Sequence, residues 1–122
     1  MVERPEEITA AFLNELDKHI FDIASGSKEI FYEISDFAAI LCIHPIHLSN
    51  TVKTVTGKAP CHHCESKLAI VAKHLLESTP MTISQIAYRL TYNPPGFTRF
   101  FKKYTGVSPK QYRASLKLSA DV

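Results

Sequence analysis

Apolar residues recur along the chain at the three- and four-residue spacing that is typical of amphipathic helices. The first such segment runs from Pro5 to about Ala24, and Gly26 follows it as a stop signal. One face of this segment is expected to be buried, and it consists of Ile8, Phe12, Leu16, Ile20 and Ile23. The pattern therefore predicts a long helix at the start of the chain.

Two stretches further along the chain repeat one pattern. Residues 37–60 and 86–109 align without a gap at an offset of 49, and seven of the 24 aligned pairs are identical. This is more than unrelated segments would share, so the chain contains a duplicated unit. The identical pairs are Ala38/Ala87, Leu41/Leu90, Pro45/Pro94, Lys53/Lys102, Thr56/Thr105, Gly57/Gly106 and Pro60/Pro109.

Each repeat is predicted to be a helix, a short turn and a second helix. In the second repeat Thr82 and Gln85 form a capping box, and Asn93 is a good N-cap before Pro94. The apolar positions of this repeat are Ile83, Ile86, Ala87, Leu90, Phe97, Phe101 and Tyr104, with Gly106 as the stop. The first repeat has the same layout in Phe37, Ala38, Leu41, Leu48, Val52, Val55 and Gly57, with His44 as a poorer cap. Two helices joined by so short a turn form a helix-turn-helix.

Two further helices frame the repeats. One runs from Pro60 to about Glu77, which at ~1.5 Å per residue spans ~26 Å. Its inward residues are expected to be Leu68, Val71, Ala72, Leu75 and Leu76. The other begins at a capping box formed by Ser108 and Gln111, and is expected to bury Tyr112 and Leu116. Successive major-groove faces of DNA lie ~34 Å apart, so the first of these helices could place two reading helices on adjacent turns.

The net charge of +2 conceals a strong asymmetry. Residues 1–36 carry nine acidic and three basic residues, whereas residues 37–122 carry three acidic and eleven basic ones. A basic body of this kind suits a polyanion such as nucleic acid. The length of 122 residues fits one domain or two small lobes, and no apolar run approaches the ~18–20 residues of a membrane span. Three cysteines argue against a disulfide framework and for a cytoplasmic setting.

The sequence resembles the AraC/XylS-type DNA-binding domain over roughly residues 8–117. The resemblance rests on the paired helix-turn-helix, the run FFKKYTGVSPKQYR at residues 100–113, the segment AKHLL at 72–76, and Ile86-Ala87. It implies an all-α fold of seven helices, with two homeodomain-like helix-turn-helix lobes at 1–59 and 79–122 joined by a linker helix at 60–78. It also implies sequence-specific binding of double-stranded DNA and regulation of transcription, most often as an activator. One departure is Thr91, where the family usually has Gly.

Recognition helices are expected at about 45–56 and 94–105, in adjacent major grooves. Helix direction, the repeat offset and the family's contact positions together nominate base-contact candidates, which are Ile46, His47, Ser49, Asn50, Thr98 and Arg99. The phosphate-contact candidates are Lys53, Lys102 and Lys103. Pro95 and Gly96 offer no side-chain donors, so the second helix is expected to read fewer bases than is typical.

A cluster of cysteines and histidines raises the alternative of a metal- or thiol-responsive regulator. The candidate residues are Cys61, His62, His63 and Cys64. The position at a helix start lowers a thiol pKa, but a zinc signature has two spaced pairs and this segment has one. Small cysteines that are buried or at the edge of the core explain the segment equally well. We therefore expect neither a metal nor another cofactor.

The remaining alternatives concern the class of protein. An enzyme is not expected, because the sequence has no phosphate loop, no paired carboxylates on the basic body and no Ser/His/Asp setting. A protein-interaction module with weak DNA binding is a second possibility, in which the acidic first helix docks on a partner. The expected partners are double-stranded DNA and RNA polymerase, with no membrane. This chain is expected to be a monomer, or a dimer if it is part of a longer protein.

Overall fold

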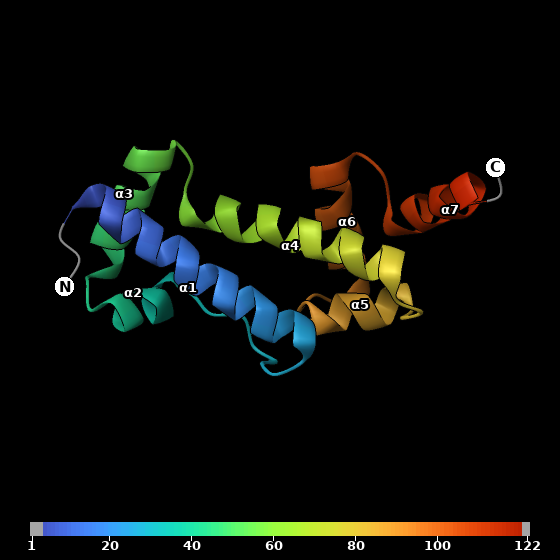
Figure 1. The fold of residues 1–122 in the computed structure, drawn as a ribbon, viewed down its shortest axis with the longest axis horizontal. Helices are drawn as coiled ribbons and strands as arrows, with labels where there is room; N and C mark the ends of the chain where they lie inside the picture. The colour runs from blue at the N-terminus through green and yellow to red at the C-terminus, as the bar shows by residue number, and fades with distance from the viewer. Residues whose placement is uncertain (1–3, 121–122) are drawn as a thin grey trace. The chain divides into compact units, whose positions relative to one another are not determined.

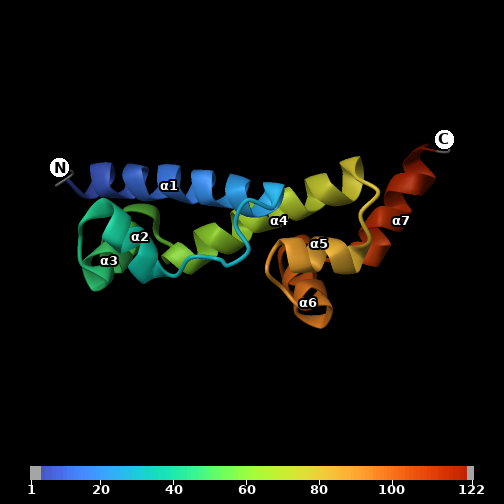
Figure 2. The same cartoon turned by 90° about the horizontal axis from the view of Figure 1, so that it is seen from below.

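The computed structural model describes the backbone of residues 4–120 and the side chains of residues 4–117, and within them it contains seven helices and no strand (Figures 1 and 2). The all-α prediction is thus confirmed. The helices are α1 (Pro5–Ser25), α2 (Ile34–Leu41), α3 (Pro45–Thr56), α4 (Pro60–Ser78), α5 (Ile83–Arg89), α6 (Pro94–Thr105) and α7 (Pro109–Ala120). Between residues 4 and 120, no helix has the apolar length that crossing a bilayer requires.

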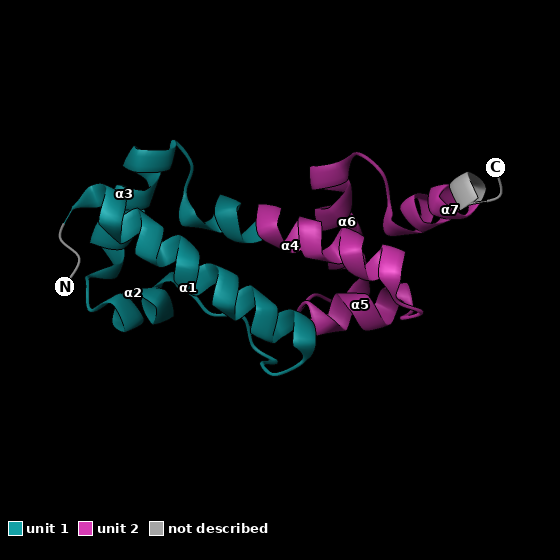
Figure 3. Ribbon diagram, viewed as in Figure 1, with its two compact units in different colours: residues 1–65 teal, residues 66–122 magenta. Residues whose placement is uncertain are grey.

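The chain divides into two compact units, residues 1–65 and residues 66–122 (Figure 3). The boundary lies inside α4, so each unit contains part of that helix. The first unit holds α1, α2 and α3, and the second holds α5, α6 and α7. Each unit therefore contains one complete copy of the repeat.

In the first unit α1 packs along α2 and α3 (Figure 2). All five apolar residues predicted to face inward from α1 are buried, and Gly26 ends the helix in a left-handed conformation. The aromatic rings of Phe12 and Phe37 meet edge to face, with their centroids 5.4 Å apart. Leu48 and Val52 of α3 complete the core. The long amphipathic helix is therefore the support against which the first helix-turn-helix packs.

The core of the first unit also contains a histidine, His19 of α1. The His19 side chain is only 3% exposed, and its ring stacks on Tyr32 with a centroid distance of 3.9 Å. The Tyr32 backbone N–H donates to His19 Nε2 at 2.9 Å, so the ring proton lies on Nδ1, which has no hydrogen-bond partner within the described residues. Burial lowers the pKa of His19, and Asp22 opposes this shift. A neutral imidazole thus joins α1 to the segment that leads into α2.

The core of the second unit is rich in aromatic residues. Phe97, Phe100 and Phe101 of α6 are buried, and the Tyr92 ring stacks on Phe100 with a centroid distance of 4.7 Å. Ile86, Ala87 and Leu90 are buried as predicted, as are Leu68, Ala72 and Leu76 of α4. Val71, Leu75, Tyr112 and Leu116 are half-buried. The predicted apolar stripes therefore form the core of this unit, with partial exposure at its edge.

The prediction that Val55 continues the buried stripe of α3 is wrong, because its side chain is 39% exposed. Val55 lies in the last turn of the helix. Its counterpart in the second repeat, Tyr104, extends over Phe100 with a ring centroid distance of 5.5 Å. A valine at this position is too short to make the same contact.

Arg113 of α7 holds the end of α4 and the loop that follows it. Its guanidinium donates to three backbone carbonyls, those of Leu76 (3.3 Å), Thr79 (3.2 Å) and Met81 (2.6 Å). The last carbonyls of a helix have no partner within the helix, so a side-chain donor satisfies them. The residue that ends the family-like run at 100–113 is therefore a structural clamp in the second unit.

Candidate nucleic-acid interface

The two turns between paired helices have the same hydrogen bonds. The Ile43 N–H donates to the Ala38 carbonyl at 3.0 Å, and the Tyr92 N–H donates to the Ala87 carbonyl at 2.9 Å. These donors and acceptors are related by the repeat offset of 49. The duplication seen in the sequence is therefore a duplication of backbone structure.

Both turns place a residue other than glycine in the left-handed region. Cys42 has a φ of 59° and Thr91 has a φ of 72°, and the two positions are again related by the offset of 49. For residues with a Cβ this conformation costs ~1–2 kcal/mol, and β-branched residues adopt it rarely. The departure from the family pattern at Thr91 is thus a point of backbone strain at the entrance to α6.

Side-chain caps begin both recognition helices. Asn93 Oδ1 accepts from the Gly96 N–H at 2.7 Å, which confirms the predicted cap of α6. His44 Nδ1 accepts from the Ile46 N–H at 3.2 Å, so the residue predicted to be the poorer cap makes the longer bond. Gly57 and Gly106 end the helices with φ of 81° and 83°, as predicted. The backbone of α3 and that of α6 are therefore defined at both ends.

Most of the candidate contact residues on α3 lie on its exposed face. Ile46 is 65% exposed, and His47, Asn50 and Lys53 are also exposed. Ser49 is half-buried. Residues 46, 50 and 53 are spaced four and three apart, so they form one stripe opposite Leu48 and Val52. An apolar residue at 65% exposure on this stripe is available for contact with an apolar group such as a base methyl.

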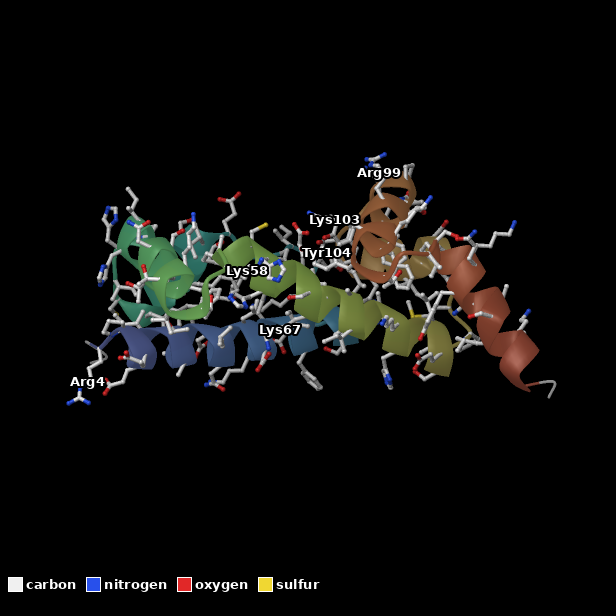
Figure 4. All side chains as sticks on the ribbon, turned by 90° about the horizontal axis from the view of Figure 1, so that it is seen from above. Arg4, Lys58, Lys67, Arg99, Lys103 and Tyr104 are labelled. Atoms are coloured by element: carbon white, nitrogen blue, oxygen red, sulfur yellow. The ribbon has the colours of Figure 1, made fainter. Side chains whose placement is uncertain are left out.

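The candidates on α6 form the matching stripe. Arg99 and Lys102 are exposed, and Figure 4 shows the Arg99 side chain projecting from α6 away from the helices behind it. Lys103 is also exposed, with its ammonium 5.4 Å from the centroid of the Tyr104 ring. Thr98 is half-buried, and its hydroxyl donates to the Pro94 carbonyl at 3.1 Å. Within each unit the structure thus places the predicted residues on one helix face, with Ser49 and Thr98 at its edge.

A side chain at position 96 would require the Asn93 cap of α6 to shift. A Cβ placed on Gly96 would lie 2.8 Å from Asn93 Oδ1, the atom that caps the helix. The matched residue on α3 is His47, whose side chain is exposed. The absence of a side chain at this point of α6 is therefore linked to its strong N-cap.

One structural role was missed in the sequence. The hydroxyls of Thr56 and Thr105 donate to the carbonyls of Val52 and Phe101, at 2.7 Å and 2.8 Å, where each recognition helix ends. Both threonines were among the identical repeat pairs, and that identity was the available signal. These hydrogen bonds stabilise the last turn of each helix, and neither threonine is among the proposed base contacts.

The cysteine and histidine residues at the start of α4 do not form a metal centre in the structure. Within the described residues, no group of three or more His, Cys, Asp or Glu side chains is arranged to hold an ion. Cys61 Sγ donates to Glu65 Oε1 at 3.3 Å, and His63 Nε2 lies 2.8 Å from Thr56 Oγ1. The expectation of a lowered thiol pKa is wrong for Cys64, because burial raises its pKa to about 12. A thiol that stays protonated is a poor nucleophile.

Comparison with known proteins places the chain in a family. A family model described as a helix-turn-helix domain matches residues 37–115. The arabinose operon regulatory protein of Escherichia coli is 31% identical over 119 residues, which cover 93% of this chain and 41% of that protein. An uncharacterized HTH-type transcriptional regulator of Bacillus subtilis, YobQ, is 33% identical over 84 residues, which cover 68% of this chain and 35% of that protein.

Solved structures show the same fold. The C-terminal domain of AraT, a response regulator from Geobacillus stearothermophilus, superposes with a TM-score of 0.78 at 30% identity, covering 93% of this chain and 88% of that domain. The DNA-binding domain of AdpA, solved in complex with a target DNA, superposes with a TM-score of 0.72 at 20% identity, covering 88% of this chain and 94% of that one. This chain therefore belongs to the AraC-type family of helix-turn-helix DNA-binding domains. It covers well under half the length of the two regulators compared above.

Proposed function

We propose that this chain is the DNA-binding part of a transcriptional regulator and that α3 and α6 each enter the major groove of one DNA duplex. The observation that carries the proposal is the pair of matched, exposed faces on α3 and α6, built on the same backbone hydrogen bonds. Neither helix contains an acidic residue, so nothing on either helix repels phosphate. A recognition helix of a helix-turn-helix reads bases from such a face.

Each exposed side chain has a proposed role. Asn50 suits a bidentate contact with adenine and Arg99 one with guanine, each worth ~1–3 kcal/mol of discrimination, and Ile46 suits a thymine methyl group. His47, Ser49 and Thr98 complete the base contacts at the edges of the two stripes. Lys53, Lys102 and Lys103 contact phosphates, which position the protein without reading sequence. The site is then a bipartite, asymmetric sequence bound by a monomer of this chain.

The cellular role follows from the resemblance to the family. We infer transcriptional activation in the cytoplasm, with RNA polymerase as the protein partner. A reporter gene placed behind the selected DNA site tests the sign of regulation: expression of the regulator that contains this chain raises its transcription. A fall in transcription would contradict activation and leave the proposal of DNA binding intact.

The test of DNA binding is a fluorescence titration of the purified chain with duplex DNA between 50 and 200 mM salt. We expect affinity that falls steeply with salt, and Lys102→Ala reduces the log–log slope by about 0.9. Lys73→Ala removes one exposed positive charge from α4 and is the matched control, with an unchanged slope. Absence of salt-dependent binding by the wild-type chain contradicts the proposed function. An unchanged slope for Lys102→Ala would remove that residue from the phosphate contacts.

A further inference from the structure

The charge asymmetry of the sequence coincides with the division into two units. Residues 1–65 contain five basic and ten acidic residues, which give a net charge of −5, and residues 66–122 contain nine basic and two acidic residues, which give +7. Each unit nevertheless contains one copy of the same helix-turn-helix. The two copies of the helix-turn-helix therefore belong to units of opposite net charge.

The same contrast appears on the two recognition helices. The repeat offset pairs position 46 with 95, 47 with 96, 50 with 99, 53 with 102 and 54 with 103. On α3 these positions carry an isoleucine, a histidine, an asparagine, a lysine and a threonine, which hold one positive charge with histidine neutral. On α6 they carry a proline, a glycine, an arginine and two lysines, which hold three positive charges.

The first turns of α3 and α6 also differ in the side chains that they expose. On α3, Ile46 and His47 both present exposed side chains where a recognition helix approaches the bases. On α6, the matched Pro95 has no donor and the matched Gly96 has no side chain. The first turn of α6 therefore has no side chain with which to hydrogen-bond a base edge.

We propose that the two repeats divide the work of DNA recognition, with α3 reading sequence and α6 anchoring the protein to the phosphate backbone. The inference rests on the proposed function. Neutral side chains on α3 discriminate bases while adding little non-specific affinity, and three cations on α6 attract any duplex. The half-site under α3 is rich in A·T pairs, which suit Asn50 and Ile46, and α6 reads one guanine through Arg99.

The experiment compares two variants that change only exposed residues. The α6 variant is Arg99→Gln, Lys102→Gln and Lys103→Gln, and the α3 variant is Ile46→Ala and Asn50→Ala. Each is titrated against random-sequence duplex at several salt concentrations, and each is put through binding-site selection beside the wild-type chain. Circular dichroism melting confirms that both variants are folded.

The two variants are expected to lose different properties. The α6 variant loses affinity for random duplex, its salt slope falls by about 0.9 for each cation that contacts phosphate, and the selected motif changes at one G·C pair only. The α3 variant keeps its salt slope and its affinity for random duplex but loses the A·T-rich half of the motif. Equal loss of motif positions in the two variants, or a reduced salt slope in the α3 variant, overturns the division of work. A wild-type chain that binds no duplex would instead overturn the proposed function.

Discussion

At the scale of single residues, the two turns show where the backbone holds strain. Cys42 and Thr91 stand at matched positions with φ of 59° and 72°, in the region that glycine adopts without steric cost. Thr91 is the less suitable of the two because its side chain branches at Cβ. Thr91 stands two residues before Asn93, the cap of α6, so this strain borders the proposed DNA-binding helix.

Replacing Thr91 with glycine is expected to stabilise the chain by up to ~1.5 kcal/mol. The relief of ~1–2 kcal/mol of backbone strain is partly offset by the ~0.5–1 kcal/mol of entropy that glycine loses on folding. Urea denaturation measures the change in the free energy of unfolding. Thr54→Gly, at an exposed position inside α3, is the control and should destabilise the chain, since no strain is relieved there. Equal destabilisation by both substitutions would show that Thr91 is not strained.

The buried imidazole of His19 predicts a loss of stability in mild acid. Burial lowers its pKa in the folded chain below the ordinary value of 6.5, so the unfolded chain binds the proton more tightly. The contribution of neutral His19 is complete above pH 6.5 and is lost as the pH falls from 6.5 toward the lower folded pKa. The slope in this window is at most ~1.4 kcal/mol per pH unit.

An NMR titration of the His19 ring measures this pKa directly, and unfolding curves between pH 7.5 and 5.5 measure its effect on stability. The matched control is His19→Gln, which has no titrating ring and should lose this part of the pH dependence. A His19 pKa at or above 6.5 contradicts the account of a buried, neutral ring.

For whole helices, local sequence signals predicted the caps and stops better than the burial of individual residues. The caps at Thr82 and Asn93 and the stops at Gly57 and Gly106 were predictable because the atoms that form them lie within three or four residues. The beginning of α2 was not, because the N–H of its N-cap residue, Glu33, is satisfied by the Asp36 carboxylate rather than in a Ser/Thr capping box.

Burial depends on neighbouring helices and was harder to predict. His19 lies three residues after Leu16 and four before Ile23 on the inner face of α1, yet only the contact with Tyr32 shows that a histidine belongs there. Val55 fits the apolar spacing of α3, but it lies in the last turn of the helix and its side chain stays exposed. Spacing identified the faces of the helices, and packing decided which residues of each face are covered.

The unequal caps of the two recognition helices lead to a reciprocal prediction. His44→Asn gives α3 the cap that α6 has, and should raise the free energy of unfolding by ~0.5–1 kcal/mol because asparagine is among the preferred N-cap residues. Asn93→His is the matched reverse change and should lower it by a similar amount, since it lengthens the bond to the Gly96 N–H. Urea denaturation of both variants checks this. Two changes of the same sign would mean that the caps do not limit the stability of these helices.

For the whole chain, the proposed function rests on the repeat and on the distribution of charge. The repeat predicted two helix-turn-helix units, and the structure contains one in each compact unit. The candidate contact residues could be nominated from the sequence because their spacing places them opposite the buried stripe. The constraint at Gly96 could not be foreseen, because it arises from the position of the Asn93 side chain in the folded turn.

An NMR titration of the ¹⁵N-labelled chain with its selected duplex shows which helices contact the DNA. We expect the largest shifts of backbone amides in α3 and α6, residues 45–56 and 94–105. Amides on the exposed side of α1 should shift little, because that helix carries five of the ten acidic residues of the first unit. Shifts confined to α1 or α7, with α3 and α6 unchanged, would contradict the claim that these two helices bind DNA.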